Sequence, residues 1–151
     1  MNQGKRFEKN FSNSCNKQNI LCIRLNDSST SFIMEKNARF TPDNPCDYIN
    51  FYRNCLFPVE CKSTEYGSIS IQLEPQEKSK MIKLHQYNSL VNFSLYEGVY
   101  PCFLFNFRQK EGVDEDTYLM YVGDFTNFLS KTDKHSINKL DIVQNGGIIV
   151  E

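Results

Sequence analysis

Residues 47–62 read DYINFYRNCLFPVECK, and this stretch decides the fold that we predict for the chain. Apolar and aromatic residues fill most of positions 48–52 and 56–61, and Asn54-Cys55 between the two runs predicts a turn. The pattern indicates a β-hairpin. Pro58 is typical of an edge strand or of a bulge near the start of the second arm.

The hairpin is expected to gather charged side chains at one spot. Side chains two residues apart share a face of a strand, so Glu60 and Lys62 point to the same side and Cys61 to the other. Because the chain folds back, the Asp47 carboxylate can come alongside this pair. We therefore expect two acids and one lysine together, with the backbone carbonyl of Cys61 as a further oxygen.

This group of side chains suits metal-assisted hydrolysis. Two carboxylates and a carbonyl oxygen are ligands that Mg²⁺ accepts while keeping several waters. A neighbouring ammonium can orient a metal-bound water or help to deprotonate it, and the product is a nucleophile for phosphodiester hydrolysis. The alternative is an ordinary exposed ion pair between Glu60 and Lys62 on a solvated sheet.

The remaining sequence predicts one α/β domain in which a mixed sheet is flanked by helices. Residues 26–44 have no clear periodicity, and we expect a mobile loop there. The expected elements, in chain order, are a helix over 4–17, a strand over 20–25, the hairpin, a helix over 81–95, strands over 100–107 and 117–122, a helix to about 130 that Asp124 caps, a helix from Ser136 to Asn145, and an apolar tail over 148–150.

Composition narrows the class of protein. The 151 residues match the usual size of one domain. No apolar run is long enough to span a bilayer, and six cysteines without a Cys-x-x-Cys pair indicate reduced, buried thiols, so we expect a cytoplasmic protein. The net charge is −1, but residues 1–40 hold 7 Lys and Arg against 3 Asp and Glu, a local balance of +4. A polyanionic partner would have to meet a local basic face.

The site residues carry a family resemblance. Asp47-Tyr48, Tyr52 and the Glu60–Lys62 triplet resemble the PD-(D/E)xK nuclease core, and more narrowly the RecU-type Holliday junction resolvases, in a divergent or phage-type form. Other segments agree with this resemblance: GKRFE at 4–8 with the family's opening helix, LHQYNSL at 84–90 with its His-Gln helix, the strand over 103–107, and the end over 136–149.

The resemblance implies a restriction-endonuclease-like fold with an α-β-β-β-α-β core in one domain over 1–151, and a shortened stalk over 26–44. It also implies a homodimeric, Mg²⁺-dependent endonuclease, with Mn²⁺ as a substitute, that resolves four-way DNA junctions by paired nicking in a bacterial or phage-infected cell. The alternatives are a same-fold nuclease acting on a flap, nick or restriction target, and an inactive DNA-binding module.

The resemblance also implies roles for individual residues. Asp47, Glu60 and the Cys61 carbonyl would hold the metal, while Lys62 would place the attacking water. Glu8 would approach from the first helix to hold a second ion or a bound water, or would be an exposed helix acid. Gln86 would steady the site or contact phosphate, or would be a packed helix amide.

Other residues compete for a part in the site. His85 is a candidate general base or a structural histidine, and Asp43 competes with Asp47 as the motif acid. Lys78, Lys80 and Lys83 either contact a phosphate backbone or solvate the start of a helix. The strand over 100–107 and the apolar tail are the candidate dimer surfaces.

Overall fold

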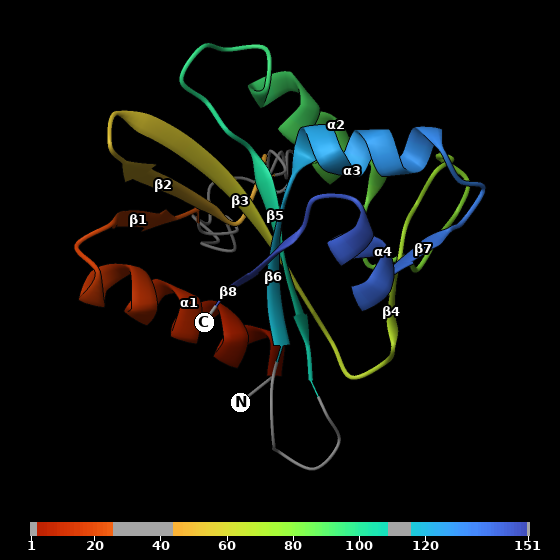
Figure 1. Cartoon of the computed structure of the whole chain (residues 1–151), viewed down its shortest axis with the longest axis horizontal. Coiled ribbons are helices and arrows are strands. Elements are labelled where there is room, and N and C mark those ends of the chain that lie inside the picture. The colour runs from red at the N-terminus through yellow and green to blue at the C-terminus, as the bar shows by residue number, and fades with distance from the viewer. Residues whose placement is uncertain (1–2, 26–43, 109–115, 151) are drawn as a thin grey trace, which may run out of the picture.

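A six-stranded mixed sheet forms the centre of the molecule (Figure 1). The computed structural model describes residues 3–25, 44–108 and 116–150. One pair of neighbouring strands is parallel and the others are antiparallel, as predicted for a mixed sheet. The strand order across the sheet is β1 (Leu21–Arg24), β2 (Tyr48–Tyr52), β3 (Cys55–Thr64), β5 (Cys102–Phe107), β6 (Asp116–Tyr121) and β8 (Ile148–Val150).

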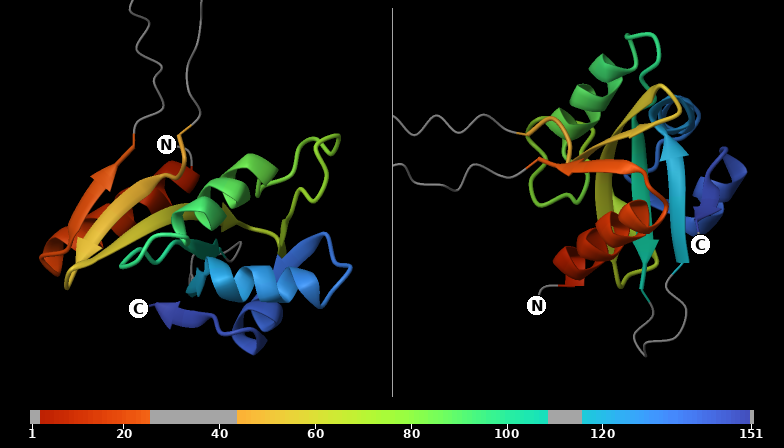
Figure 2. Two further views of the ribbon diagram at one scale, coloured as in Figure 1. Left: turned by 90° about the horizontal axis from the view of Figure 1, so that it is seen from above. Right: turned by 90° about the vertical axis from the view of Figure 1, so that its left-hand side faces the viewer.

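Helices cover both faces of this sheet. Helix α1 (Gln3–Lys17) packs through Phe7 and Phe11 on one face, where Cys102 and Leu104 of β5 point. Helices α2 (Leu84–Phe93) and α3 (Val122–Ser130) cover the other face, where the ring centroids of Phe103 and Phe125 lie 4.7 Å apart. Figures 1 and 2 show α2 and α3 side by side and α1 apart from them. Because β5 has helices or strands on every side, all six of its residues are buried.

A two-residue turn joins the hairpin strands. Arg53 and Asn54 both have positive φ, 48° and 62°, and Tyr52 pairs directly with Cys55. Two central residues with positive φ are typical of the tight turns whose twist matches that of the flanking strands. The hairpin is as predicted, but the turn lies one residue earlier than Asn54-Cys55, because Cys55 already belongs to β3.

Pro58 interrupts the parallel pairing of β3. Leu56 forms an isolated bridge with Val99, and continuous pairing with β5 starts at Val59 opposite Cys102, in the same register. Proline has no N–H to donate to the ladder between these two points. Pro58 therefore marks the edge-like start of β3 that the sequence predicted, while its carboxyl-terminal half is central in the sheet.

Three predicted helix starts are wrong in detail. The helix expected from Met81 begins at Leu84, because Ile82 forms a bridge with Ile71. Asp124 lies in the first turn of α3 rather than at its N-cap. The residues from Ser136 first form β7 (Ser136–Asn138), which pairs with β4 (Ser68–Ser70) in a second small sheet, and only then α4 (Lys139–Gln144).

Two further expectations concern the loop and the membrane. Nearly all of the loop expected over 26–44 lies outside the described residues. Within the described ranges, no helix is both long and apolar enough to cross a membrane. All six cysteines are free thiols, and four of them are buried.

Candidate active site

Asp47 stands where β2 separates from β3. The last β2–β3 pair joins Tyr48 to Val59, and the Asp47 Oδ2 then accepts a hydrogen bond of 2.7 Å from the Cys61 backbone N–H. The carboxylate thus replaces the next strand pair. In a strand, the N–H and C=O of one residue point to the same side, so the Cys61 carbonyl opens toward Asp47. The sequence predicted that the Asp47 carboxylate and the Cys61 carbonyl lie on a common side, and this strand geometry agrees.

Glu60 and Lys62 point to the same face of β3, as predicted. The Lys62 Nζ lies 2.7 Å from the Glu60 Oε1, and their side chains are only 13% and 2% exposed. Cys61 points to the opposite face and packs in the core under α1. The pair is therefore not the exposed ion pair that the alternative interpretation required.

Gln86 reaches the same carboxylate from α2. Its Nε2 donates to the Glu60 Oε1, and its Oε1 accepts from the Lys83 N–H at 3.0 Å. Because the first backbone amides of a helix have no intrahelical acceptor, a side chain three residues on can satisfy one of them. Because the Gln86 Oε1 accepts the Lys83 N–H, the Nε2 of the same amide points toward Glu60. The start of α2 and the site share one side chain.

Burial raises the pKa of Glu60 to about 7, and the nearby Asp47 and Glu8 carboxylates act in the same direction. The Lys62 ammonium and its hydrogen bond oppose the shift without cancelling it. A buried carboxyl group whose pKa lies near neutrality is typical of a functional site, because burial disfavours its charged form and the neighbouring acids add to that effect.

Glu8 belongs to this electrostatic neighbourhood through α1. Its Oε2 accepts from the Arg24 Nη2 at 2.5 Å, and its backbone carbonyl accepts from the Tyr48 hydroxyl at 3.1 Å. Glu8 is half-buried. The sequence nominated Glu8 but gave no role to Arg24 or Tyr48, because only the packing of α1 against β1 and β2 brings these residues to it.

The donor set fits a divalent cation that keeps most of its water. Within the described parts of the chain, no group of three or more His, Cys, Asp and Glu side chains could form a protein-only metal site. Asp47, Glu60 and the Cys61 carbonyl are hard oxygen donors, and the raised pKa of Glu60 indicates a position where added positive charge would be favourable. These residues are therefore suited to Mg²⁺ rather than to a metal that prefers nitrogen or sulfur ligands.

The competing residues lie elsewhere. His85 is exposed on α2, one position before Gln86. Lys80 pairs with Glu77 at 3.6 Å in the loop that precedes α2, and Lys78 is exposed in the same loop. Lys83 is the N-cap of α2. Asp43 lies outside the described residues.

Comparison with known structures identifies the fold. Hjc, a Holliday junction resolvase from the archaeal hyperthermophile Archaeoglobus fulgidus, superposes with a TM-score of 0.59 over 97% of this chain and 95% of its own. The two sequences are 16% identical. The chain therefore has the mixed α/β fold of this nuclease, a central sheet flanked by helices.

Sequence comparison identifies the family. No protein-family model matches the chain. The SPbeta prophage-derived uncharacterized protein YotM of Bacillus subtilis (strain 168) is 32% identical over 148 residues, which cover 93% of this chain and 70% of the relative. The chain belongs to the family of this prophage protein.

Proposed function

We propose that this chain is a metal-dependent endodeoxyribonuclease that resolves four-way DNA junctions in recombination and repair. The observation that carries the proposal is the buried Glu60 carboxylate, which contacts Lys62 and Gln86 and lies beside Asp47. The fold of a junction resolvase and the prophage origin of the relative support this proposal. We further propose that the protein acts in the cytoplasm of a bacterial or phage-infected cell.

The protein residues have distinct tasks in this proposal. Asp47, Glu60 and the Cys61 carbonyl would hold Mg²⁺, for which Mn²⁺ could substitute, and Glu8 would hold a second ion or a bound water. The metal, when bound, supplies a polarised water and stabilises charge that develops on the scissile phosphate. Two hydrogen bonds to the Glu60 Oε1 fix the orientation of that carboxylate, so the donor set is preorganised.

Lys62 has a further task beside the phosphate. Its side chain is 13% exposed against 2% for that of Glu60, so Lys62 lies between the buried carboxylate and solvent. A cation in this position can donate a hydrogen bond to the attacking water and can face the negative charge of the phosphate. We therefore assign to Lys62 the placement of the nucleophile, and to Gln86 the support of Glu60.

Resolution of a four-way junction also requires two active sites. Paired nicks in strands of like polarity are most simply made by two copies related by a two-fold axis, and an isologous dimer has this symmetry. We propose a homodimer. The strand over 100–107 is mostly unsuitable as its surface, because β5 is buried within one copy, but Tyr100 and the tail remain exposed.

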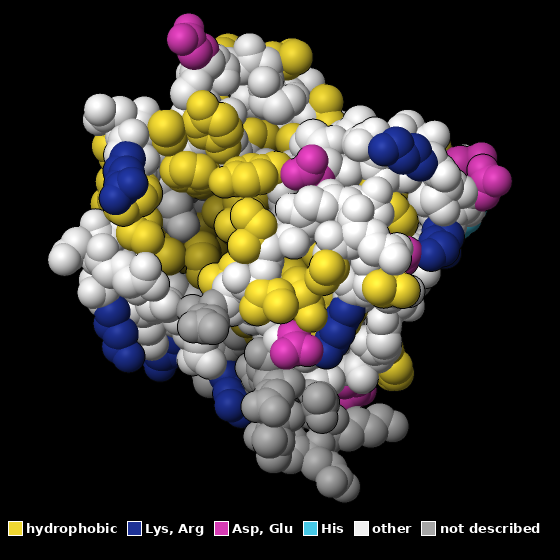
Figure 3. All heavy atoms as spheres, viewed as in Figure 1, with side chains coloured by type: hydrophobic (Ala, Val, Ile, Leu, Met, Phe, Trp, Pro, Cys, Tyr) yellow, Lys and Arg dark blue, Asp and Glu magenta, His cyan; other side chains and the backbone are white. Residues whose placement is uncertain are grey.

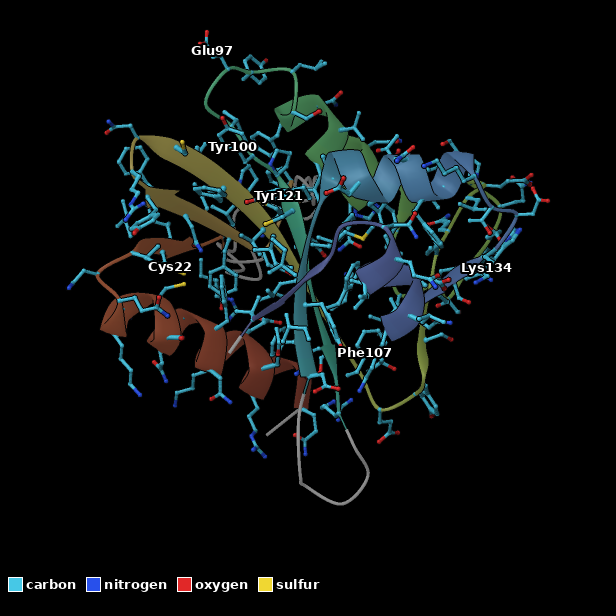
Figure 4. The ribbon with its side chains drawn as sticks, in the orientation of Figure 1. Cys22, Glu97, Tyr100, Phe107, Tyr121 and Lys134 are labelled. Carbon is cyan, nitrogen blue, oxygen red and sulfur yellow. The ribbon has the colours of Figure 1, made fainter. Side chains whose placement is uncertain are left out.

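Exposed and partly buried apolar residues of β3, β6, β8 and the segment before β5 lie together on one surface. We define the apolar face as Phe57, Tyr100, Leu119, Tyr121 and Ile148. It is the part of the α1 side of the sheet that α1 leaves uncovered, and hydrophobic side chains gather there in Figure 3, with Tyr100 and Tyr121 labelled in Figure 4. The rings of Phe57 and Tyr100 stack at 5.8 Å across it. A second copy is the occupant that the proposed activity requires.

A cleavage assay tests the proposal. Purified protein with Mg²⁺ should cut a labelled four-way junction into paired nicked duplexes, and should spare a flap, a nicked duplex and a linear duplex of the same sequence. Lys62→Ala should bind the junction and fail to cut it. Preferred cleavage of the flap or the linear duplex would make the chain a nuclease of another substrate. Binding without cleavage in either Mg²⁺ or Mn²⁺ would favour an inactive DNA-binding module.

A further inference from the structure

An open cleft lies on the α1 side of the sheet and is lined by residues of α1, β1 and β2. Its volume is about 280 Å³. Its lining residues are Lys5, Lys9, Ser12, Asn13, Arg24 and Tyr48. The proposed chemistry uses none of these side chains.

The lining of the cleft is cationic. Lys5 and Lys9 are four residues apart on α1, so they lie on one helix face about 6 Å apart along the axis. Arg24 faces them from β1, and all three side chains belong to exposed residues. No acidic residue is among the lining residues, and the nearby Glu8 pairs with Arg24, so Lys5 and Lys9 add positive charge to the cleft beyond that ion pair. Figure 3 shows Lys and Arg side chains along the lower-left margin, where Figure 1 draws α1.

The cleft is joined to the active site through its floor. Tyr48 is only 2% exposed and follows Asp47 directly in the chain. Its hydroxyl donates to the Glu8 carbonyl, which fixes the helix turn between Lys5 and Lys9 over β2. Glu8 stands between Lys5 and Lys9 in the sequence of α1, and its carboxylate acts electrostatically on Glu60, so the cleft lies on the α1 side of the active site.

We propose that this cleft binds the phosphodiester backbone of the DNA strand on the α1 side of the active site. The inference rests on the proposed nuclease function and adds the surface by which a chain of net charge −1 holds a polyanion. Hydroxyl and amide groups of Ser12 and Asn13 add donors that suit phosphate oxygens without reading bases. The contact is therefore independent of sequence and sensitive to salt.

A salt titration of DNA binding tests this surface. The protein carries Asp47→Asn throughout, so that cleavage is slow compared with the titration, and a fluorescent four-way junction is titrated by anisotropy at several NaCl concentrations. The test variant adds Lys5→Gln and Lys9→Gln. The control variant adds Lys17→Gln and Lys131→Gln, which remove two exposed lysines outside the cleft. Thermal unfolding is measured for each variant.

Each phosphate contact contributes about −0.9 to the slope of log K against log [salt] for duplex DNA. We expect the test variant to lose about one to two units of slope and roughly tenfold or more in affinity at low salt. The control should keep the slope of the parent. Equal slopes for test and parent would overturn the assignment of the cleft and leave the nuclease proposal intact, whereas a parent that binds no DNA would overturn both.

Discussion

The Asp47 carboxylate accepts the Cys61 N–H at 2.7 Å at the point where β2 stops pairing with β3. One acidic side chain thus ends a strand pair and stands next to Glu60. Asp47 therefore acts both as a hydrogen-bond acceptor and as a charge. One substitution can remove the charge alone, and another can remove both.

Asp47→Asn keeps an acceptor oxygen and loses the charge. We expect its free energy of unfolding to stay within about 0.5 kcal/mol of the parent, while junction cleavage falls on the order of 10²–10³-fold. Asp47→Ala also leaves the Cys61 N–H without its partner, which costs about 1–3 kcal/mol. Denaturant unfolding and single-turnover cleavage measure the two effects. Near-normal cleavage by Asp47→Asn would remove Asp47 from the metal site.

The buried Glu60 predicts that stability falls as the pH rises. Its folded pKa of about 7 exceeds the ordinary value of 4.5, so the folded state binds more protons in this window. The stabilisation is complete below about pH 4.5 and is lost as the pH rises through 7. A shift of this size corresponds to about 3 kcal/mol. In the absence of metal, the free energy of unfolding should decrease between pH 5 and 8.

Glu60→Gln is the matched variant for this measurement, since its amide does not titrate. Its free energy of unfolding should be nearly level over the same pH range, and the two curves should diverge toward pH 8. Added Mg²⁺ should stabilise the parent at pH 8 more than at pH 5, because the carboxylate form binds the cation. Parallel curves for the parent and Glu60→Gln would contradict the burial argument.

The sequence predicted the contacts of this site that are set by local strand geometry, but its local patterns did not indicate those that depend on tertiary packing. Alternation along one strand places Glu60 and Lys62 on a common face, and a short hairpin carries Asp47 back to them, so local geometry was sufficient. The contact of Gln86 with Glu60 depends on how α2 docks against β3, and only the family resemblance nominated it. Arg24 had no local signal, since it meets Glu8 across the α1–β1 packing.

Tertiary pairing also overrides local helix signals elsewhere in the chain. Ser136 looks like an N-cap, but its segment pairs with β4, and Ile137 and Ile69 are both fully buried in that pairing. The helix then begins after Asn138, whose side chain accepts from the Asp141 N–H. A residue that could cap a helix thus became part of a strand because an apolar partner strand lay beside it.

Gln86 should act as a positioning residue. Gln86→Ala removes the donor to Glu60, and we expect cleavage to fall about 10–100-fold, the range typical of groups that orient metal ligands. Loss of this hydrogen bond should also raise the pKa of Glu60, so the pH–rate profile should move to higher pH. A uniform loss of rate without a pH shift would indicate a structural role alone.

Two variants control for the helix cap and for its neighbour. Gln86→Glu retains an acceptor for the Lys83 N–H but places a carboxylate against Glu60, so its cleavage should be lower than that of Gln86→Ala. His85→Ala, on the exposed side of α2, should cleave like the parent. A large loss in His85→Ala would restore the histidine as a candidate general base.

The apolar face predicts a dimer, and a charged residue introduced into this face should weaken it. Ile148 is 55% exposed and pairs with Leu119, so both side chains lie on the α1 side of β6 and β8. Ile148→Glu would bury a carboxylate in the proposed interface, and the dimer dissociation constant should rise by about tenfold or more, since an unpaired buried charge is costly. Leu140→Glu, at a 63% exposed position on α4, is the matched control. Sedimentation velocity over a concentration series measures both, and a parent that stays monomeric at every concentration would exclude this face as the dimer interface.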